Sequence, residues 1–296
     1  MKKLFYILLF FLPTVVQSQT IPDDIKKTVV FIYAQNANGK LIPNGTGFFI
    51  GVENIENKET FSVYFVTAKH VLQYGADKKY LDKVYLRLNK KDSTAESKGL
   101  MLYESGINKN IYTHSDATVD IAVIPLLPSQ EIYDFLFMPN NFLNSKQDYK
   151  EMNIREGSDV FFTGMFTPFL GEKKNYPITR FGRVALVTEE KIPWDNQLTD
   201  LYLVESSSYG GNSGSPVFFY LGANRGDGSL HVGPPIIKLA GIMKGYFGEK
   251  SPISVVETNK VAVSDRNIGI AAVVPAYLLQ EILYSDELIE KRGLKK

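Results

Sequence analysis

The apolar positions of this chain fall in short runs that are rich in Val, Ile, Phe and Tyr and are separated by Gly, Asn, Asp and Lys. Such runs are typical of β-strands joined by tight turns. The pattern predicts strands in the first half at Thr28–Tyr33, Gly45–Val52, Phe61–Thr67, Lys83–Asn89, Leu100–Glu104 and Ile121–Leu126. In the second half it predicts strands at Asp159–Thr163, Thr179–Thr188, Leu201–Glu205, Pro216–Tyr220, Ile236–Lys244, Lys260–Val263 and Ile268–Val274.

A polar stretch over residues 131–155 interrupts this rhythm, and apolar positions at helical spacing appear only at Ala276–Leu283, directly after Pro275. Two groups of strands and one closing helix indicate an all-β protein built from two barrels or sandwiches. The expected division is a leader at 1–18, a first β-barrel at 19–130, a connection at 131–155, a second barrel at 156–274, and a helix with a charged tail at 275–296.

The first residues read as a secretory signal peptide. Lys2 and Lys3 precede an apolar run from Leu4 to Leu12, and small or polar residues follow as far as Ser18. A retained membrane anchor is the alternative, but a membrane span needs about 17–25 apolar residues. We therefore expect cleavage after Ser18 and export to the periplasm or beyond the cell, with no membrane span afterwards.

Charge and cysteine content exclude several classes of protein. The 296 residues carry a formal net charge of +1, and loss of Lys2 and Lys3 leaves the chain close to neutral. No basic excess is present to hold a nucleic acid. The chain has no Cys, which excludes disulfides, thiol catalysis and cysteine metal sites. No His, Asp and Glu residues stand at metal-ligand spacing, so neither a metal nor another cofactor is expected.

The residues that carry candidate chemistry begin with the run from Tyr209 to Pro216, in which Ser213 lies among glycines. Glycines allow the backbone to turn so that successive N–H groups point into one small space. The N–H groups of Gly211 and Ser213 could there stabilise an oxyanion, with Ser213 as the nucleophile. Taken alone, such a cluster is most often a turn.

Two further residues stand where a base and its orienting acid would be needed. His70 follows the apolar run Phe61–Thr67, separated from it by Ala68 and Lys69. Asp120 directly precedes the apolar run Ile121–Leu126. A single His is more often structural, and an Asp before a strand is often a turn residue. His114, His231 and Asp116 lie in polar segments, and we expect them at the surface.

Three blocks of sequence together resemble the trypsin-like serine peptidases. They are Thr67-Ala68-Lys69-His70-Val71, then Asp120-Ile121-Ala122-Val123, then Gly211-Asn212-Ser213-Gly214-Ser215-Pro216. The order His, Asp, Ser is that of the family. The chain is most similar to the bacterial branch of HtrA-like and staphylococcal glutamyl-endopeptidase-like enzymes. Flanking agreement at Gly45–Phe48 and around Ile268–Ala271 extends the resemblance over roughly residues 28 to 285.

The resemblance implies two six-stranded antiparallel β-barrels with the active site between them. It implies that Ser213 attacks a peptide carbonyl, that His70 takes and returns the proton, and that Asp120 orients His70. Gly211 and Ser213 would supply the oxyanion hole. The implied activity is that of an exported serine endopeptidase acting on protein or peptide substrates.

The chain departs from the family at three points. Asn212 replaces the Asp that captures a new N-terminus in animal digestive enzymes, so no activating cleavage is expected. The strand that walls the specificity pocket lacks the His of the glutamyl endopeptidases. No segment of the length of a PDZ domain follows the closing helix.

The pocket beside the nucleophile is expected to be formed by Ser207, Ser208, Met243, Lys244 and Gly245. These residues include no carboxylate, so cleavage should follow uncharged, small-to-medium or apolar side chains, with acidic ones second through Lys244.

Two alternatives remain open from the sequence. The same three residues can serve an esterase, because a fold does not determine the acyl substrate. The fold can also act as a binding or scaffold module with negligible turnover. The sequence leaves the natural substrate and the oligomeric state undetermined.

Overall fold

The computed structural model describes residues 20–54, 57–104, 107–108, 110–208, 210–225, 228–254 and 261–293. For 104, 107–108, 249–254 and 261–266 only the backbone is described. The expected signal peptide at 1–18 lies outside these residues, and so does Tyr209 of the serine motif.

The first half of the chain forms one antiparallel sheet with an added parallel strand. Its order is β10-β11-β3-β2-β1-β6-β7, and β12 pairs in parallel with β2. The bounds are β1 Val29–Gln35, β2 Leu41–Glu53, β3 Phe61–Thr67, β6 Lys83–Asn89, β7 Ala95–Met101, β10 Tyr112–Thr113, β11 Ala122–Pro125 and β12 Met138–Pro139. Two short hairpins lie outside the sheet: β4 Gln73–Tyr74 with β5 Lys79–Tyr80, and β8 Tyr103–Glu104 with β9 Ile107–Asn108.

The second half closes into a six-stranded barrel in the order β13-β14-β17-β20-β19-β18. The bounds are β13 Asp159–Gly164, β14 Ile178–Leu186, β17 Tyr202–Glu205, β18 Pro216–Leu221, β19 Ile236–Ser254 and β20 Val261–Pro275. A separate hairpin, β15 Ile192–Trp194 with β16 Gln197–Thr199, lies between β14 and β17 along the chain. The predicted all-β fold of two strand groups is therefore confirmed, with a closed barrel in the second group.

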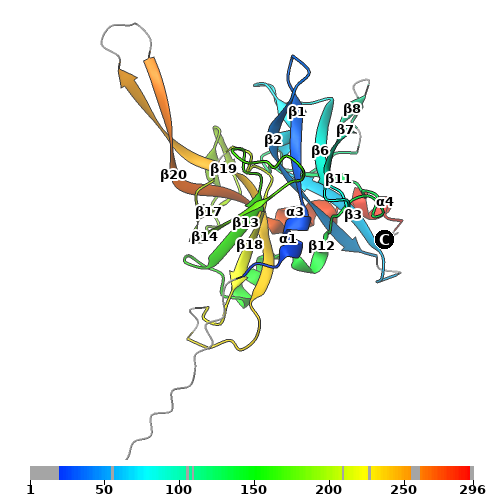
Figure 1. The fold of residues 1–296 in the computed structure, drawn as a ribbon. Helices are drawn as coiled ribbons and strands as arrows, with labels where there is room; N and C mark the ends of the chain where they lie inside the picture. The colour runs from blue at the N-terminus through cyan, green and yellow to red at the C-terminus, as the bar shows by residue number, and fades with distance from the viewer. Residues whose placement is uncertain are drawn as a thin grey trace, which may run out of the picture.

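Short helices connect and close the two halves: α1 Asp23–Lys27, α2 Lys146–Glu151, α3 Ala276–Leu283 and α4 Asp286–Lys291, with 3-10 turns η1 Lys69–Leu72 and η2 Asn140–Phe142. The predicted helix after Pro275 is α3, which begins and ends where the apolar spacing indicated. In Figure 1, α3 lies between the sheet of the first half and the barrel of the second.

A single large apolar cluster joins the halves. It contains the inner face of the first sheet (Phe48, Phe65), barrel residues (Phe161, Phe218) and Leu279 of α3. Burying such a side chain contributes about 1.5–3 kcal/mol to stability. Burial of apolar surface therefore holds the two halves together as well as stabilising each half. A second cluster, around Phe162, Phe219 and Met243, fills the barrel alone.

Several strands differ from the sequence prediction, β7 and β19 among them. β7 begins at Ala95, not at Leu100, because it is an edge strand whose mostly exposed side chains show no alternation of apolar positions. β19 continues beyond its predicted end at Lys244 as far as Ser254, and its residues Gly248–Ser254 pair with Val261–Asn267 of β20. Together these strands form a ribbon that extends beyond the barrel (Figure 1).

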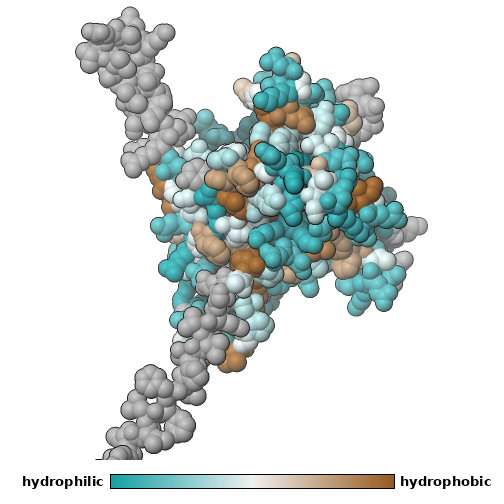
Figure 2. All heavy atoms as spheres, in the orientation of Figure 1, coloured by the Kyte–Doolittle hydropathy of each residue, from teal (hydrophilic) through white to brown (hydrophobic). Residues whose placement is uncertain are grey.

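The outer surface is mainly hydrophilic on the face shown in Figure 2, where hydrophobic residues form several separate patches. Among the described residues, none of the helices has the length and apolar character needed to cross a bilayer.

Candidate active site

Strand pairing brings His70 and Asp120 together. β3 and β11 are antiparallel neighbours in which Ala122 lies opposite Thr67. His70 follows β3 by three residues and Asp120 precedes β11 by two, so both lie beyond the same end of this pair. The chain turns there into η1, and the His70 side chain remains 46% exposed while that of Asp120 is 6% exposed.

Asp120 makes two hydrogen bonds to His70. Its Oδ2 lies 2.6 Å from His70 Nδ1, and its Oδ1 accepts the His70 backbone N–H at 2.9 Å. The two bonds fix both the position of the imidazole and the nitrogen that carries its proton. With Nδ1–H donated to the carboxylate, Nε2 is the nitrogen left to accept a proton.

A third donor reaches the same carboxylate from the other half of the chain. Lys244 lies in β19, and its Nζ is 3.0 Å from Asp120 Oδ2. The Lys244 side chain is 10% exposed, so this ion pair is largely buried. Asp120 Oδ2 is therefore shared between the imidazole and an ammonium group. The sequence prediction missed this contact.

The charge state of Asp120 follows from these partners. Burial acts to raise the pKa of Asp120, but the charge and hydrogen bonds of His70, together with the Lys244 ammonium, hold that pKa well below its ordinary value. The carboxylate is therefore ionised throughout the range in which imidazole titrates.

Ser213 lies in the loop between β17 and β18, three residues before β18 begins at Pro216. Backbone bonds hold this loop against β19: the Gly214 N–H donates to the Met243 carbonyl at 2.8 Å, and the Met243 N–H donates to the Ser215 carbonyl at 2.9 Å. These two backbone hydrogen bonds place Ser213 beside Lys244, the residue that follows Met243 in β19.

The Ser213 hydroxyl donates to the Lys244 backbone carbonyl at 3.1 Å. Within the described part of the chain, no hydrogen bond joins Ser213 Oγ to His70. The structure thus brings His70 and Asp120 into direct contact and places Ser213 at the neighbouring strand, with its hydroxyl turned toward the backbone.

Thr46 of β2 anchors the serine loop to the first half of the chain. Its N–H donates to the Ser213 carbonyl at 2.8 Å, and its Oγ1 donates to the Gly211 carbonyl at 2.7 Å. The same Oγ1 accepts the Met165 N–H at 3.0 Å. Thr46 is fully buried. A weak signal of this role is visible in the sequence, where Thr46 stands between two glycines within an apolar strand.

The backbone at Gly211 and Gly214 requires glycine. Both have positive φ, +94° and +85°, and a Cβ on Gly214 would lie 2.0 Å from the Thr46 carbonyl oxygen. Among the described residues, the N–H groups of Gly211 and Ser213 donate to no backbone carbonyl. The absence of such a bond is what the predicted role of these two N–H groups as oxyanion donors requires.

A cavity of about 440 Å³ opens beside His70. Its lining includes Lys69, Lys78, Lys244 and the ring of Trp194. Of the five residues expected to form a specificity pocket, only Lys244 lines this cavity.

The other four residues of that expected pocket lie elsewhere. The Met243 side chain is fully buried in the barrel core and does not line this cavity. Ser208 is also buried, while Ser207 is exposed and its carbonyl accepts a hydrogen bond from Arg180. Gly245 faces Trp194, whose ring would lie 3.2 Å from a Cβ at that position.

Two residues expected to be solvated have structural partners. The His114 side chain is 13% exposed; its Nε2 lies 2.8 Å from Glu281, and its Nδ1 accepts the Asp116 N–H. Asp116 pairs with Lys191 at 2.7 Å and accepts two hydrogen bonds from Thr118. These contacts brace the turn before Asp120. No three His, Asp or Glu side chains gather in a metal-binding group among the described residues.

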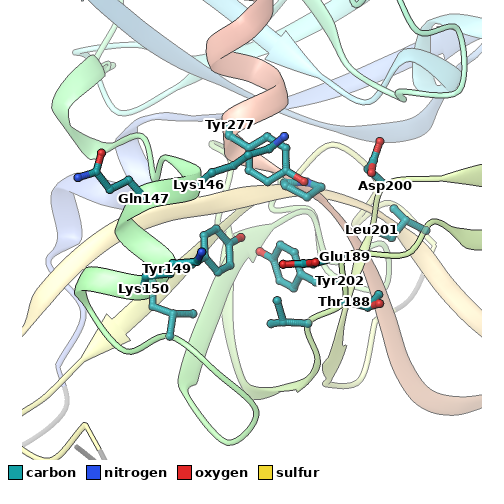
Figure 3. A pocket seen from close by; sticks show the side chains of 13 residues that line it. Lys146, Gln147, Tyr149, Lys150, Thr188, Glu189, Asp200, Leu201, Tyr202 and Tyr277 are labelled. Atoms are coloured by element: carbon teal, nitrogen blue, oxygen red, sulfur yellow. The ribbon is translucent and has the colours of Figure 1, made fainter.

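A larger cavity, of about 740 Å³, lies between α2, β17 and the start of α3 (Figure 3). The hydroxyls of Tyr149 and Tyr202 point toward one another in it, and the Tyr277 ring lies beside them. Tyr202 is 2% exposed and its hydroxyl has no hydrogen-bond partner among the described residues. Burial, followed by its two tyrosine neighbours, raises the pKa of Tyr202 well above its ordinary value. None of the residues predicted to act in catalysis lines this cavity.

Comparison with known proteins gives one family match. The model of the trypsin-like peptidase domain matches residues 45–223, which contain His70, Asp120 and Ser213. A search of curated protein sequences finds no match. Among solved structures, the crystal structure of the MamO protease domain from Magnetospirillum magneticum (apo form) is similar, with 15% identity and a TM-score of 0.48 over 87% of this chain and 96% of that one. At these values the structural likeness supports no conclusion about the site.

Proposed function

Because the chain belongs to the trypsin-like peptidase family, we propose that it is a serine endopeptidase whose catalytic residues are Ser213, His70 and Asp120. The observation that carries the proposal is the pair of hydrogen bonds between His70 and the Asp120 carboxylate. These bonds fix the imidazole ring and leave Nε2 able to accept a proton. In an otherwise exposed turn, such fixation is what a general base requires.

The proposed first step begins with a rotation of the Ser213 side chain away from the Lys244 carbonyl toward His70. The Ser213 proton then passes to His70 Nε2 while Oγ bonds to the peptide carbonyl carbon. The carbonyl oxygen becomes an oxyanion, held by the N–H groups of Gly211 and Ser213. Removing one such donor from a serine peptidase costs about 2.7–4 kcal/mol of transition-state stabilisation.

The second step releases the amine and then the acid. The scissile C–N bond breaks as His70 returns its proton to the leaving nitrogen, which leaves an acyl group on Ser213. A water molecule gives a proton to His70 and attacks the acyl carbon. His70 then returns that proton to Oγ as the C–Oγ bond breaks, which restores Ser213 and releases the new carboxyl group. Throughout, Asp120 stabilises the imidazolium that forms on His70.

We further propose that the protein is exported, because of the basic start and the short apolar run at residues 1–18. N-terminal sequencing of the protein recovered from cell fractions tests this. A start near Gln19 in the exported fraction supports export, and an intact Met1 in the cytoplasm argues against it.

One observation favours the alternative of a binding module with negligible turnover, namely that the Ser213 hydroxyl bonds to the Lys244 carbonyl and not to His70. Hydrolysis of casein and of a small ester by the wild type and by Ser213→Ala separates the possibilities. Casein cleavage that Ser213→Ala abolishes supports the peptidase. Ester cleavage alone supports the esterase, and no turnover of either supports the binding module.

A further inference from the structure

The ion pair between Lys244 and Asp120 affects the chemistry that the proposed function assigns to Asp120. In a triad the carboxylate stabilises the imidazolium that forms in the transition state. Lys244 places a positive charge 3.0 Å from the same carboxylate oxygen that faces His70 Nδ1. In a largely buried setting that charge is weakly screened. It therefore offsets part of the support that Asp120 gives to the imidazolium.

Lys244 also faces the cavity beside His70, and that cavity is rich in ammonium groups. Lys69, Lys78 and Lys244 all line it, and Asp195 is the one carboxylate in the described lining besides Asp120. Lys69 is held in place by donating to the Ala117 carbonyl at 2.8 Å. The cavity thus presents three cations within reach of the space that a substrate bound at His70 would enter.

The behaviour of Lys69 shows the crowding of positive charge. Burial lowers the pKa of Lys69, and the ammonium groups of Lys244 and Lys78 lower it further, although Asp120 and Asp116 act in the opposite direction. Like charges that share a poorly solvated space raise one another's free energy. An anion entering this space would relieve the repulsion and would find several donors.

Trp194 limits where Lys244 can move. Its ring centroid lies 5.7 Å from Lys244 Nζ, within the range of a cation–π contact, and the ring also lines the cavity. A Lys side chain has a flexible stem and three donors. Nζ can therefore leave Asp120 for an anion in the cavity while it remains against the same ring.

We propose that Lys244 restrains the triad when the cavity is empty and that an acidic side chain of the substrate, bound in the cavity, draws Lys244 away from Asp120. The inference rests on the proposed peptidase function and adds a substrate class to it, namely polypeptides with Glu or Asp close to the scissile bond on the side that enters this cavity. Binding and activation then occur together, because the same ammonium group serves both.

The test uses quenched fluorescent peptides of one sequence, with Glu or Gln at each of the four positions before the scissile bond. For the wild type we expect kcat/KM to be about tenfold higher with Glu at one position, as for a hydrogen bond to a charged group. Raising the salt concentration should reduce this preference because it screens the ion pair.

Two variants separate charge from structure. Lys244→Gln keeps a donor for Asp120 and removes the charge, while Lys244→Met removes both. With Lys244→Gln we expect the Glu preference to fall to near unity, kcat on the Gln peptide to rise severalfold, and the acidic limb of the pH–rate profile to move to higher pH. Lys244→Arg should keep the preference, and Lys83→Met, an exposed change on β6 away from the cavity, should alter none of these values.

The outcomes distinguish failure of the inference about Lys244 from failure of the proposed peptidase function. Labelling of Ser213 by a fluorophosphonate is measured on every sample. If the wild type is not labelled and cleaves no peptide, the proposed function fails. If it is labelled and cleaves both peptides equally, or if Lys244→Gln lowers kcat on both peptides with their ratio unchanged, Lys244 is a structural clamp and the inference is overturned.

Discussion

Thr46 and Ser213 link the two halves of the molecule at the proposed nucleophile. The Thr46 N–H donates to the Ser213 carbonyl at 2.8 Å, and Thr46 Oγ1 bonds to both Gly211 and Met165. The loop that would form the oxyanion hole is thus held by a residue of the first sheet. Alignment of Ser213 with His70, which lies in that same half, depends on this contact.

Thr46→Val should therefore reduce both stability and activity. It leaves the Gly211 carbonyl and the Met165 N–H without their partner, at a cost of about 1–3 kcal/mol for each buried group. We expect kcat to fall at least tenfold because the donor positions loosen. Urea unfolding and peptide hydrolysis measure the two effects. Thr46→Ser, which keeps the hydroxyl, should behave nearly as the wild type; equal damage from both changes would mean that the lost methyl group matters and the hydroxyl does not.

Asp120 and Asp116 should differ sharply on substitution. Asp120→Asn favours the wrong tautomer of His70 and should lower kcat about 10⁴-fold. Asp116 pairs with Lys191 at a partly exposed site, so Asp116→Asn should cost at most about 1 kcal/mol of stability and little activity. Steady-state kinetics on both variants checks this. A severe effect of Asp116→Asn with a mild one of Asp120→Asn would mean that Asp116 orients the base.

Part of the loss of stability at acid pH should come from protonation of Asp120. The folded protein holds the pKa of this carboxyl below its ordinary value because, against the effect of burial, its partners stabilise the ionised form. Its contribution to stability is thus present above the unfolded-state pKa of about 4 and is lost as pH falls through the lower folded-state value. Unfolding by urea between pH 7 and pH 3 should show a smaller loss for Asp120→Asn than for the wild type. An identical pH slope in the two proteins would contradict this assignment.

Tyr202 offers a test of a buried hydroxyl that has no partner among the described residues. Tyr202→Phe removes a desolvated polar group without breaking a hydrogen bond, so the free energy of unfolding should stay the same or rise by up to about 1 kcal/mol. The matched control is Tyr133→Phe, which removes a bond of 3.1 Å to Glu96 and should lower stability by about 0.5–1.5 kcal/mol. A clear loss of stability in Tyr202→Phe would show that a water molecule or ligand in the cavity binds this hydroxyl.

Much of the fold could be predicted because the relevant signals are local. The apolar runs at Phe61–Thr67 and Ile121–Leu126 contain all of β3 and β11, and His70 and Asp120 lie just beyond the ends of these runs. The antiparallel pairing of these strands explains why residues 50 positions apart meet. The edge strand β7 could not be found in the same way, because neither of its faces is buried and its side chains carry no periodic signal.

The site was less predictable where it depends on tertiary register. Lys244 was expected at a pocket rim, but a side chain of β19 points inward or outward according to the bulges of the strand, and the ladder shifts between Met243 and Gly245. Its contact with Asp120 spans 124 positions and joins the two halves of the chain. Nothing local in the sequence encodes such a contact.

The central claim is that Ser213 is a nucleophile activated by His70, and covalent labelling tests it most directly. The purified protein is treated with a fluorophosphonate probe, the adduct is located by mass spectrometry, and the labelling rate is compared for the wild type, Ser213→Ala and His70→Ala. The proposed triad predicts one adduct per chain on Ser213, none in Ser213→Ala, and labelling slower by at least about 10³-fold in His70→Ala. Failure of the folded wild type to react, or an adduct on another residue, would contradict it.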